Sequence, residues 1–157
     1  MTNLTASDVM TRDVLTVHPD WSLELLLAFL SDHAITGAPV AGDDGKPIGV
    51  VSLSDIAKSG AMIERTDRRP APAYYRDGVE LFLSRDDVDR LVQARDAEVR
   101  VRDLMTPMVF SVDETTTVQE IAEAMITGRI HRVFGTRDGR IVGVVSSLDL
   151  LPIVRDL

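Results

Sequence analysis

Cysteine is absent from this chain of 157 residues, and histidine occurs only three times. Without cysteine the chain forms no disulfide bond, offers no thiolate ligand to a metal ion and has no cysteine nucleophile. The three histidines, His18, His33 and His131, lie far apart in the sequence and do not show a metal-binding spacing. Neither a disulfide scaffold nor a sequence-local metal site is therefore expected.

Basic residues are outnumbered by acidic ones: 17 Lys and Arg stand against 25 Asp and Glu, which gives a formal net charge of −8. This is the wrong sign for general nucleic-acid binding, where much of the affinity comes from neutralising phosphates. The most apolar run, residues 23–30, contains Glu24 and is far too short to cross a bilayer. The first ten residues lack the basic and apolar regions of a signal peptide. We expect a cytoplasmic protein that binds neither nucleic acid in general nor membranes.

Sequence motifs of catalysis are also missing. No glycine-rich phosphate loop follows a strand pattern, and no nucleophile has a nearby histidine in a recognisable arrangement. We therefore expect that the protein is not an enzyme and requires no cofactor. Its length suits one compact module or two small ones with a real hydrophobic core.

What the chain does contain is an internal repeat. Residues 49–55 read GVVSLSD, and residues 143–149 read GVVSSLD. Residues 8–11 (DVMT) return in the same way as residues 103–106 (DLMT). Self-similarity in one order at a nearly fixed offset is the signature of a duplicated structural unit. We expect repeat one at 1–58, an insert at 59–100 and repeat two at 101–157.

Each repeat is predicted to fold as strand, helix, strand, strand, helix, which makes the fold class α/β (α+β). The helix follows from apolar residues spaced i, i+3, i+4, i+7, and the last two strands flank an Asp-Gly turn. In repeat one, strands are predicted at 14–17, 38–41 and 47–52, and helices at 22–33 and from Ser52. In repeat two, strands are predicted at 109–112, 132–136 and 140–146, and helices at 117–127 and from Ser146. Either Thr117 with Glu120 or Thr116 with Gln119 forms a capping box at the start of the second long helix.

A serine followed three residues later by aspartate closes each repeat, as Ser52 with Asp55 and as Ser146 with Asp149. Such a pair is typical of a helix start, where serine is the N-cap and the acid is favoured by the helix dipole. A carboxylate in the first turn can also accept both hydroxyls of a ribose, and free N–H groups there can meet phosphate. The two interpretations are compatible.

With these motifs the sequence resembles the CBS domains, which occur as tandem pairs called Bateman modules. The resemblance covers residues 7–58 and 101–155 and rests on the order and duplication of DVMT and DLMT, the amphipathic helix, ITGAPV and IHRVFG, the Asp-Gly hairpin and the GVVS segments. It implies two pseudo-symmetric units whose sheets pack together and leave two clefts. In many members those clefts bind AMP, ADP, ATP or S-adenosylmethionine.

The resemblance also implies which residues line the sites. Besides the two Ser and Asp pairs, these are Thr11, Val14, Thr106 and Val109 along the nucleotide, Gly37, Ala38, Pro39 and Val133 on the strand that holds adenine, and His131 with Arg132 near phosphate. An arginine side chain suits phosphate geometry. The ligands we expect are AMP, ADP or ATP, ahead of S-adenosylmethionine or NAD.

The two copies differ in ways that predict unequal sites. Repeat one has Thr36-Gly37 where repeat two has His131-Arg132, so positive charge is expected at only one of them. The Pro39-Val40 pair becomes Phe134-Gly135, which changes the expected adenine wall. In the last helix, Pro152 is expected to break or kink the helix unless it lies in the first turn.

The insert is not explained by the resemblance. Arg65, Arg68 and Arg69 precede Pro70-Ala71-Pro72, a loop pattern, and residues 84–97 look helical with Ser84 and Asp87 as a capping box. We expect a solvated loop around Tyr74. The alternatives are that Arg68 and Arg69 reach a phosphate, that Tyr74 stacks on a base, or that the insert docks a partner.

Two functions remain. In the first, the chain is a regulatory sensor in which an adenine nucleotide shifts a homodimer, or a complex with a regulated protein, between states. In the second, it binds no ligand and is a platform for dimerisation or partner docking.

Overall fold

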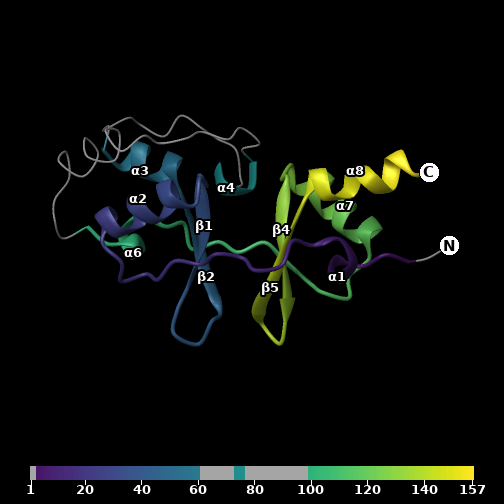
Figure 1. Ribbon diagram of the computed structural model, residues 1–157, viewed down its shortest axis with the longest axis horizontal. Coiled ribbons are helices and arrows are strands. Elements are labelled where there is room, and N and C mark those ends of the chain that lie inside the picture. The colour runs from purple at the N-terminus through teal and green to yellow at the C-terminus, as the bar shows by residue number, and fades with distance from the viewer. Residues whose placement is uncertain (1–2, 61–72, 77–98) are drawn as a thin grey trace. The chain divides into compact units, whose positions relative to one another are not determined.

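A computed structural model describes residues 3–60, 73–76 and 99–157. Helices and strands are mixed, as expected for an α/β chain (Figure 1). The elements are α1 Ala6–Val9, α2 Leu23–Asp32, β1 Gly37–Ala41, β2 Pro47–Ser52, α3 Leu53–Gly60, α4 Ala73–Arg76, α6 Val101–Leu104, β3 Ser111–Asp113, α7 Val118–Gly128, β4 Arg132–Arg137, β5 Arg140–Ser146 and α8 Ser147–Arg155.

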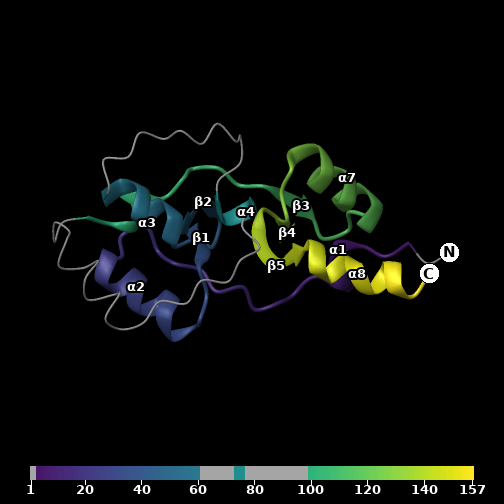
Figure 2. The same ribbon diagram turned by 90° about the horizontal axis from the view of Figure 1, so that it is seen from above.

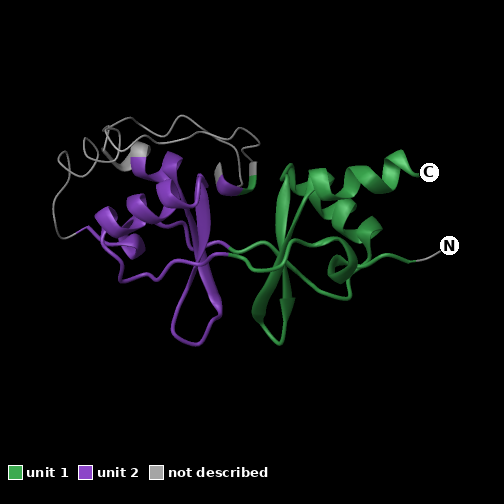
Figure 3. Ribbon diagram, in the orientation of Figure 1, with its two compact units in different colours: residues 1–14, 75–77, 109–157 green, residues 15–74, 78–108 purple. Residues whose placement is uncertain are grey.

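The chain forms two compact units, and each unit combines segments from both halves of the sequence (Figure 3). Unit 1 comprises Met1–Val14, Tyr75–Asp77 and Val109–Leu157, and unit 2 comprises Leu15–Tyr74 and Gly78–Met108. The DVMT segment that opens repeat one therefore packs with repeat two, and the DLMT segment that opens repeat two packs with repeat one.

Unit 2 is built on the antiparallel hairpin of β1 and β2. Helix α2 begins after Ser22, whose hydroxyl accepts a hydrogen bond from Leu25 N at 3.1 Å. Its apolar stripe packs into a core with both strands and α6; the buried residues of this core are Val17, Leu23, Leu26, Leu27, Leu30, Ala38, Val40, Val51, Ile56, Val101 and Leu104. The periodic leucines of the sequence thus form the inner face of the helix, as predicted.

The strand predicted at residues 14–17 is wrong. Of residues 14–17, only Val17 pairs with β1. Val17 N donates to Pro39 O and Ala41 N donates to Val17 O, each at 3.0 Å. Toward Leu15 the next bond of the ladder would be donated by the N–H of residue 39, which proline lacks, so the pairing does not extend over residues 14–16.

Unit 1 contains a three-stranded sheet in the order β3-β4-β5, with β3 parallel and β5 antiparallel to β4. Helices α7 and α8 lie side by side on one face of this sheet (Figure 2). Thr117 caps α7: its hydroxyl accepts from Glu120 N at 3.3 Å, and the Glu120 carboxylate accepts from Thr117 N at 3.0 Å. Of the two predicted capping boxes, the one of Thr117 and Glu120 is therefore present.

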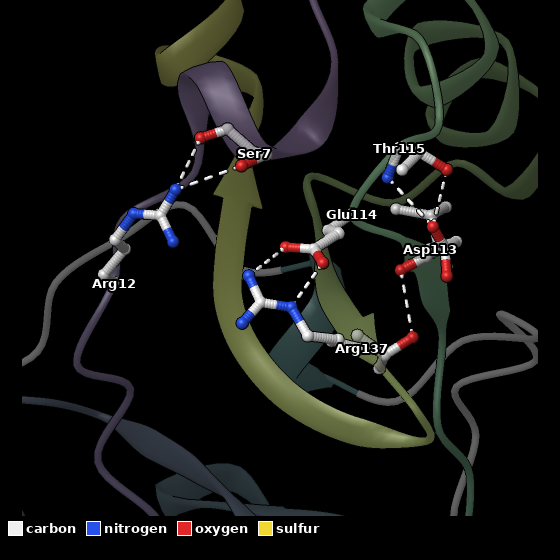
Figure 4. Close-up of polar contacts among 8 residues, drawn as sticks. Ser7, Arg12, Asp113, Glu114, Thr115 and Arg137 are labelled. Carbon is white, nitrogen blue, oxygen red and sulfur yellow. Dashed lines mark hydrogen bonds and ion pairs between the residues drawn. The ribbon is translucent and has the colours of Figure 1, made fainter.

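Within unit 1, polar contacts join the N-terminal segment to the sheet (Figure 4). Arg12 Nη2 donates to the carbonyl and the hydroxyl oxygen of Ser7, at 3.0 and 3.1 Å. Ser7 N in turn donates to Glu114 O at 2.9 Å, and the Glu114 carboxylate receives two hydrogen bonds from Arg137 on β4. The hydrogen bonds from Arg137 hold the pKa of Glu114 below its usual range. The segment and the sheet are thus joined through adjoining polar contacts.

Each GVVS segment begins with a glycine that lies against the leading segment of the other repeat. By leading segment we mean DVMT (residues 8–11) in repeat one and DLMT (residues 103–106) in repeat two. Thr106 exchanges two backbone hydrogen bonds with Val50, at 2.9 and 3.0 Å, and Thr11 does the same with Val144, at 2.9 Å each. A Cβ on Gly49 would lie 2.5 Å from Thr106 O, and a Cβ on Gly143 would lie 2.4 Å from the Met10 sulfur. Glycine recurs here because a neighbouring segment fills the space that a side chain would need.

The structure also tests the expectations for Pro152 in α8 and for the loop around Tyr74. Helix α8 continues to Arg155 with Pro152 inside it, so the proline does not end the helix. Tyr74 and Tyr75 lie in α4 and are buried, so the solvated loop expected around Tyr74 is wrong. The other features predicted in the insert lie outside the described residues; these are Arg65, Arg68, Arg69 and the helix at 84–97.

Within residues 3–60, 73–76 and 99–157, no helix has the length and hydropathy needed to span a membrane.

Candidate ligand site at the serine and aspartate pairs

In unit 1 the start of α8 is organised by Ser146 and Asp149. Asp149 Oδ2 accepts hydrogen bonds from Ser146 N at 2.8 Å and from Ser146 Oγ at 3.0 Å. The other carboxylate oxygen, Oδ1, accepts none from the described part of the chain. One oxygen of Asp149 thus caps the helix and holds the carboxylate in place, while the second remains available for another donor.

Unit 2 repeats the arrangement at the start of α3. Asp55 Oδ2 accepts from Ser52 N at 2.8 Å and from Ser52 Oγ at 3.1 Å. This pair is buried, with exposed fractions of 5% for Ser52 and 9% for Asp55, whereas both members of the pair in unit 1 are half-buried. The capping interpretation is therefore confirmed for both pairs, and the pair in unit 1 is the more accessible of the two.

The predicted residues around Asp149 come together on β4 and β5. Arg132 lies opposite Ser146 and Val133 lies opposite Val145 in the antiparallel ladder. The carbonyl of His131 accepts from Ser147 N at 2.8 Å, which ties the strand to the helix start. An arginine and a partly exposed carboxylate therefore lie at one end of this sheet.

Three other predicted site residues, Thr11, Val14 and Val109, also lie in unit 1. Thr11 joins the edge of β5 through its pairing with Val144, two residues before Ser146. Val14 and Val109 belong to the same unit but lie outside its strands.

The remaining predicted residues gather in unit 2. Gly37, Ala38 and Pro39 lie opposite Ser52, Val51 and Val50 in the hairpin, and Thr106 pairs with Val50 from the other side. The hydroxyls of Thr11 and Thr106 make no hydrogen bond within the described residues. The predicted set is thus divided across the repeats: Thr11 accompanies the pair of repeat two, and Thr106 accompanies the pair of repeat one.

Tyr75 was missed by the sequence reasoning although it contacts this region directly. Its carbonyl accepts a hydrogen bond from His131 N at 2.6 Å, and its hydroxyl oxygen accepts one from Phe110 N at 3.1 Å. Its ring meets Phe110 and Phe134 edge to face, with centroids 4.8 and 6.0 Å apart. The available signal was that the only two tyrosines of the chain are adjacent.

In the described part of the chain no group of three or more His, Cys, Asp or Glu side chains could hold a metal ion. The polar groups at the two helix starts are hydrogen-bond donors, acceptors and one guanidinium, which suits an organic ligand with hydroxyl and phosphate groups.

Comparison with known proteins accounts for this arrangement. The model of the CBS domain matches residues 6–61 and again residues 101–156. The chain belongs to the CBS domain family. The two matches coincide with the two copies of the repeat, so the CBS pair expected from the sequence is confirmed, and the gap between them contains the insert.

Relatives of this CBS pair occur alone and within longer proteins. The uncharacterized protein MJ1426 of Methanocaldococcus jannaschii is 29% identical over 153 residues, which are 92% of this chain and 87% of the relative. The chloroplastic CBS domain-containing protein CBSX1 of Arabidopsis thaliana is 28% identical over 151 residues, which are 90% of this chain. The chain spans only 60% of the length of CBSX1.

Solved CBS structures share the fold. The CBS domain of a membrane protein from Sphaerobacter thermophilus is 26% identical with a TM-score of 0.68, over 96% of this chain and 87% of that one. CBSX2 in complex with AMP is 21% identical with a TM-score of 0.66, over 97% and 96%. The CBS domain pair of MJ0100, in complex with 5′-methylthioadenosine and S-adenosylmethionine, is 21% identical with a TM-score of 0.65, over 99% and 98%.

Proposed function

We propose that this CBS pair is a non-catalytic regulatory module that binds an adenosine-containing ligand, with Asp149 as its main anchor. The proposal rests on the different contacts of the two oxygens of the Asp149 carboxylate. Oδ2 of Asp149 is held by Ser146, and Oδ1 accepts no hydrogen bond from the described residues. A fixed carboxylate oxygen is a strong acceptor for ribose hydroxyls.

The charge of the neighbouring strand favours a phosphate-bearing ligand. Arg132 lies opposite Ser146 in the sheet, and the equivalent position of unit 2 is Gly37, opposite Ser52. A guanidinium recognises phosphate by paired hydrogen bonds. We therefore expect AMP, ADP or ATP to bind more tightly than S-adenosylmethionine, which carries no phosphate. The complexes of CBSX2 with AMP and of MJ0100 with two adenosine derivatives support this ligand class.

A thermal-shift screen with AMP, ADP, ATP, NAD and S-adenosylmethionine tests the proposal. A ligand at about 100 times its dissociation constant should add roughly 2.7 kcal/mol of stability. Absence of a shift with all five ligands would contradict the proposal.

A pair of matched variants then separates binding from capping. Asp149→Ala and Glu120→Ala both remove an acid from the first turn of a helix in unit 1, so each should lose about 1 kcal/mol of stability. Only Asp149→Ala should weaken binding of AMP, by about 1.5–3 kcal/mol for a charged hydrogen bond. Equal affinities for the two variants, measured by titration calorimetry, would refute the assignment of Asp149.

The second candidate function, a platform for a homodimer or a partner protein, is favoured by the exposed face of α8. No residue of this helix is buried, and Leu148, Leu151 and Val154 are 72%, 56% and 63% exposed. Their spacing of three places them on one side of the helix, as an apolar stripe open to solvent. If a second copy covers this stripe, Leu151→Asp should lower the mass measured by light scattering to that of one chain. An unchanged mass would speak against this platform.

A further inference from the structure

Two adjacent tyrosines of the insert each contact one unit, Tyr74 in unit 2 and Tyr75 in unit 1. In unit 2 a Cβ built on Gly37 would lie 2.8 Å from Tyr74 Cδ2, so the Tyr74 ring packs on the first residue of β1. In unit 1 the Tyr75 carbonyl accepts from His131 N, just before β4. Both contacts lie at the start of the first strand of a hairpin, since Gly37 begins β1 and His131 directly precedes β4.

In unit 1 the contact is a socket of defined chemistry. Phe110 and Phe134 supply aromatic walls at centroid distances of 4.8 and 6.0 Å, with interplanar angles of 88° and 71°. The backbone N–H groups of Phe110 and His131 donate to the hydroxyl and the carbonyl of Tyr75. We call this set, Phe110, Phe134 and the N–H of His131, the aromatic socket. It holds one planar ring, donates to the hydroxyl on that ring from Phe110 N, and donates to the backbone carbonyl of Tyr75 from His131 N.

A purine base has the features that the aromatic socket selects. It is planar, it makes favourable edge-to-face contacts with aromatic side chains, and its ring nitrogens are hydrogen-bond acceptors. The socket is also next to the candidate ligand site: the carbonyl of His131 accepts from Ser147 N at 2.8 Å, one residue after Ser146. One residue, His131, therefore connects the backbone contact of Tyr75 with the helix start that presents Asp149.

Tyr75, whose ring occupies the aromatic socket, lies in the short helix α4. Tyr75 is fully buried, yet α4 comprises only the four residues Ala73–Arg76. A single helical turn has little stability of its own, so α4 is held by what its side chains contact. A ring delivered by such an element can be exchanged for another ring that replaces its contacts in the socket.

We propose that the aromatic socket of unit 1 binds one planar ring at a time: Tyr75 in the free protein and the purine base of the ligand in the complex. This inference rests on the proposed function and extends it, because it makes Tyr75 an internal competitor. The apparent dissociation constant is then the intrinsic constant divided by the fraction of molecules with a vacant socket. Removing Tyr75 should raise that fraction and tighten binding.

The test titrates AMP into the full-length chain and two variants, Tyr75→Ala and Ile121→Ala. Ile121 is a fully buried residue of α7 in the same unit, so its truncation is a control for a general loss of packing. We expect AMP to bind Tyr75→Ala about tenfold or more tightly than wild type, and Ile121→Ala no more tightly than wild type. Weaker or unchanged binding by Tyr75→Ala would overturn the inference.

A second measurement does not depend on how well the variant folds. Wild-type protein is treated with tetranitromethane with and without saturating AMP, and nitration of Tyr75 is read by mass spectrometry. Because Tyr75 is fully buried, it should react only when AMP displaces it. If wild type binds AMP and Tyr75 stays unreactive, the inference is wrong and the proposed function stands. If neither wild type nor Tyr75→Ala binds AMP, the proposed function fails and the inference fails with it.

Discussion

Alanine substitutions at Gly49 and Gly143 test whether each GVVS segment is shaped by the leading segment of the other repeat. A methyl group on Gly49 would lie 2.5 Å from Thr106 O and 3.2 Å from Pro107 Cα, both backbone atoms. A methyl group on Gly143 would lie 2.4 Å from the sulfur and 2.6 Å from Cγ of Met10, both side-chain atoms. The two substitutions are the same chemically but meet neighbours of very different stiffness.

The expected costs follow from what has to move. At Gly49 the backbone of Thr106 must shift, which strains the two hydrogen bonds between Thr106 and Val50. Overpacking typically costs about 1–3 kcal/mol, and each lost hydrogen bond adds about 1 kcal/mol, so we expect about 3–5 kcal/mol for Gly49→Ala. At Gly143 the Met10 side chain can rotate away, so we expect about 1–2 kcal/mol for Gly143→Ala.

Urea unfolding measures these costs, followed both by circular dichroism and by the fluorescence of Trp21, which belongs to unit 2. Both probes are needed because two units need not unfold together. Gly128→Ala is the matched control: a Cβ there meets only the side chain of Ile130, at 3.5 Å or more, so its effect should stay within about 0.5 kcal/mol. The reasoning is refuted if Gly49→Ala is as stable as this control.

A double-mutant cycle sharpens the result for unit 1. Met10→Ala removes the two closest atoms, so Gly143→Ala should cost about 1 kcal/mol less in that background. Strict additivity of the two substitutions would show that Met10 is not the obstacle.

Two further predictions concern α8 and the polar contacts of unit 1. Pro152→Ala should raise the free energy of unfolding by about 1–3 kcal/mol, because proline inside a helix lacks the N–H that would bond to the carbonyl of Leu148; a loss of stability in urea would contradict this. The pKa of Glu114 is lowered by Arg137, so the stability from this contact is present above the unfolded pKa and is lost as pH falls through the lower folded value. Wild type should therefore melt at a higher temperature than Glu114→Gln at pH 7 and lose this advantage below about pH 4, and a difference that does not vary with pH would exclude the ion pair as its cause.

Regular patterns in the sequence were sufficient for most helices and strands. Both hairpins were predicted closely because an Asp-Gly turn marks the connection between their strands, and β2 and β5 have the predicted bounds. The long helices were correct to within one residue at each end, because an apolar stripe and a capping residue mark their starts. Local chemistry determines these features, so a single sequence reveals them.

The cross-packing of the leading segments could not be predicted in this way. A repeat shows that DVMT and DLMT are equivalent, but equivalence does not say which copy each one contacts. The decision is made by tertiary contacts, such as the pairing of Thr11 with Val144 and of Thr106 with Val50. The burial of Tyr75 escaped prediction for the same reason, since the loop-like residues before it are a local signal and the aromatic socket is not.

The doubled motif therefore has a complete structural explanation that needs no ligand: the glycine admits a neighbouring segment, and the serine and aspartate start a helix. Evidence for binding has to come from features in which the two copies differ. Arg132 replaces Gly37 as the partner of the serine, and Asp149 is more exposed than the buried Asp55. Both differences favour unit 1. If only one site binds AMP, it should be the site of Asp149, and the corresponding Asp55→Ala variant should lose stability while keeping its affinity for AMP.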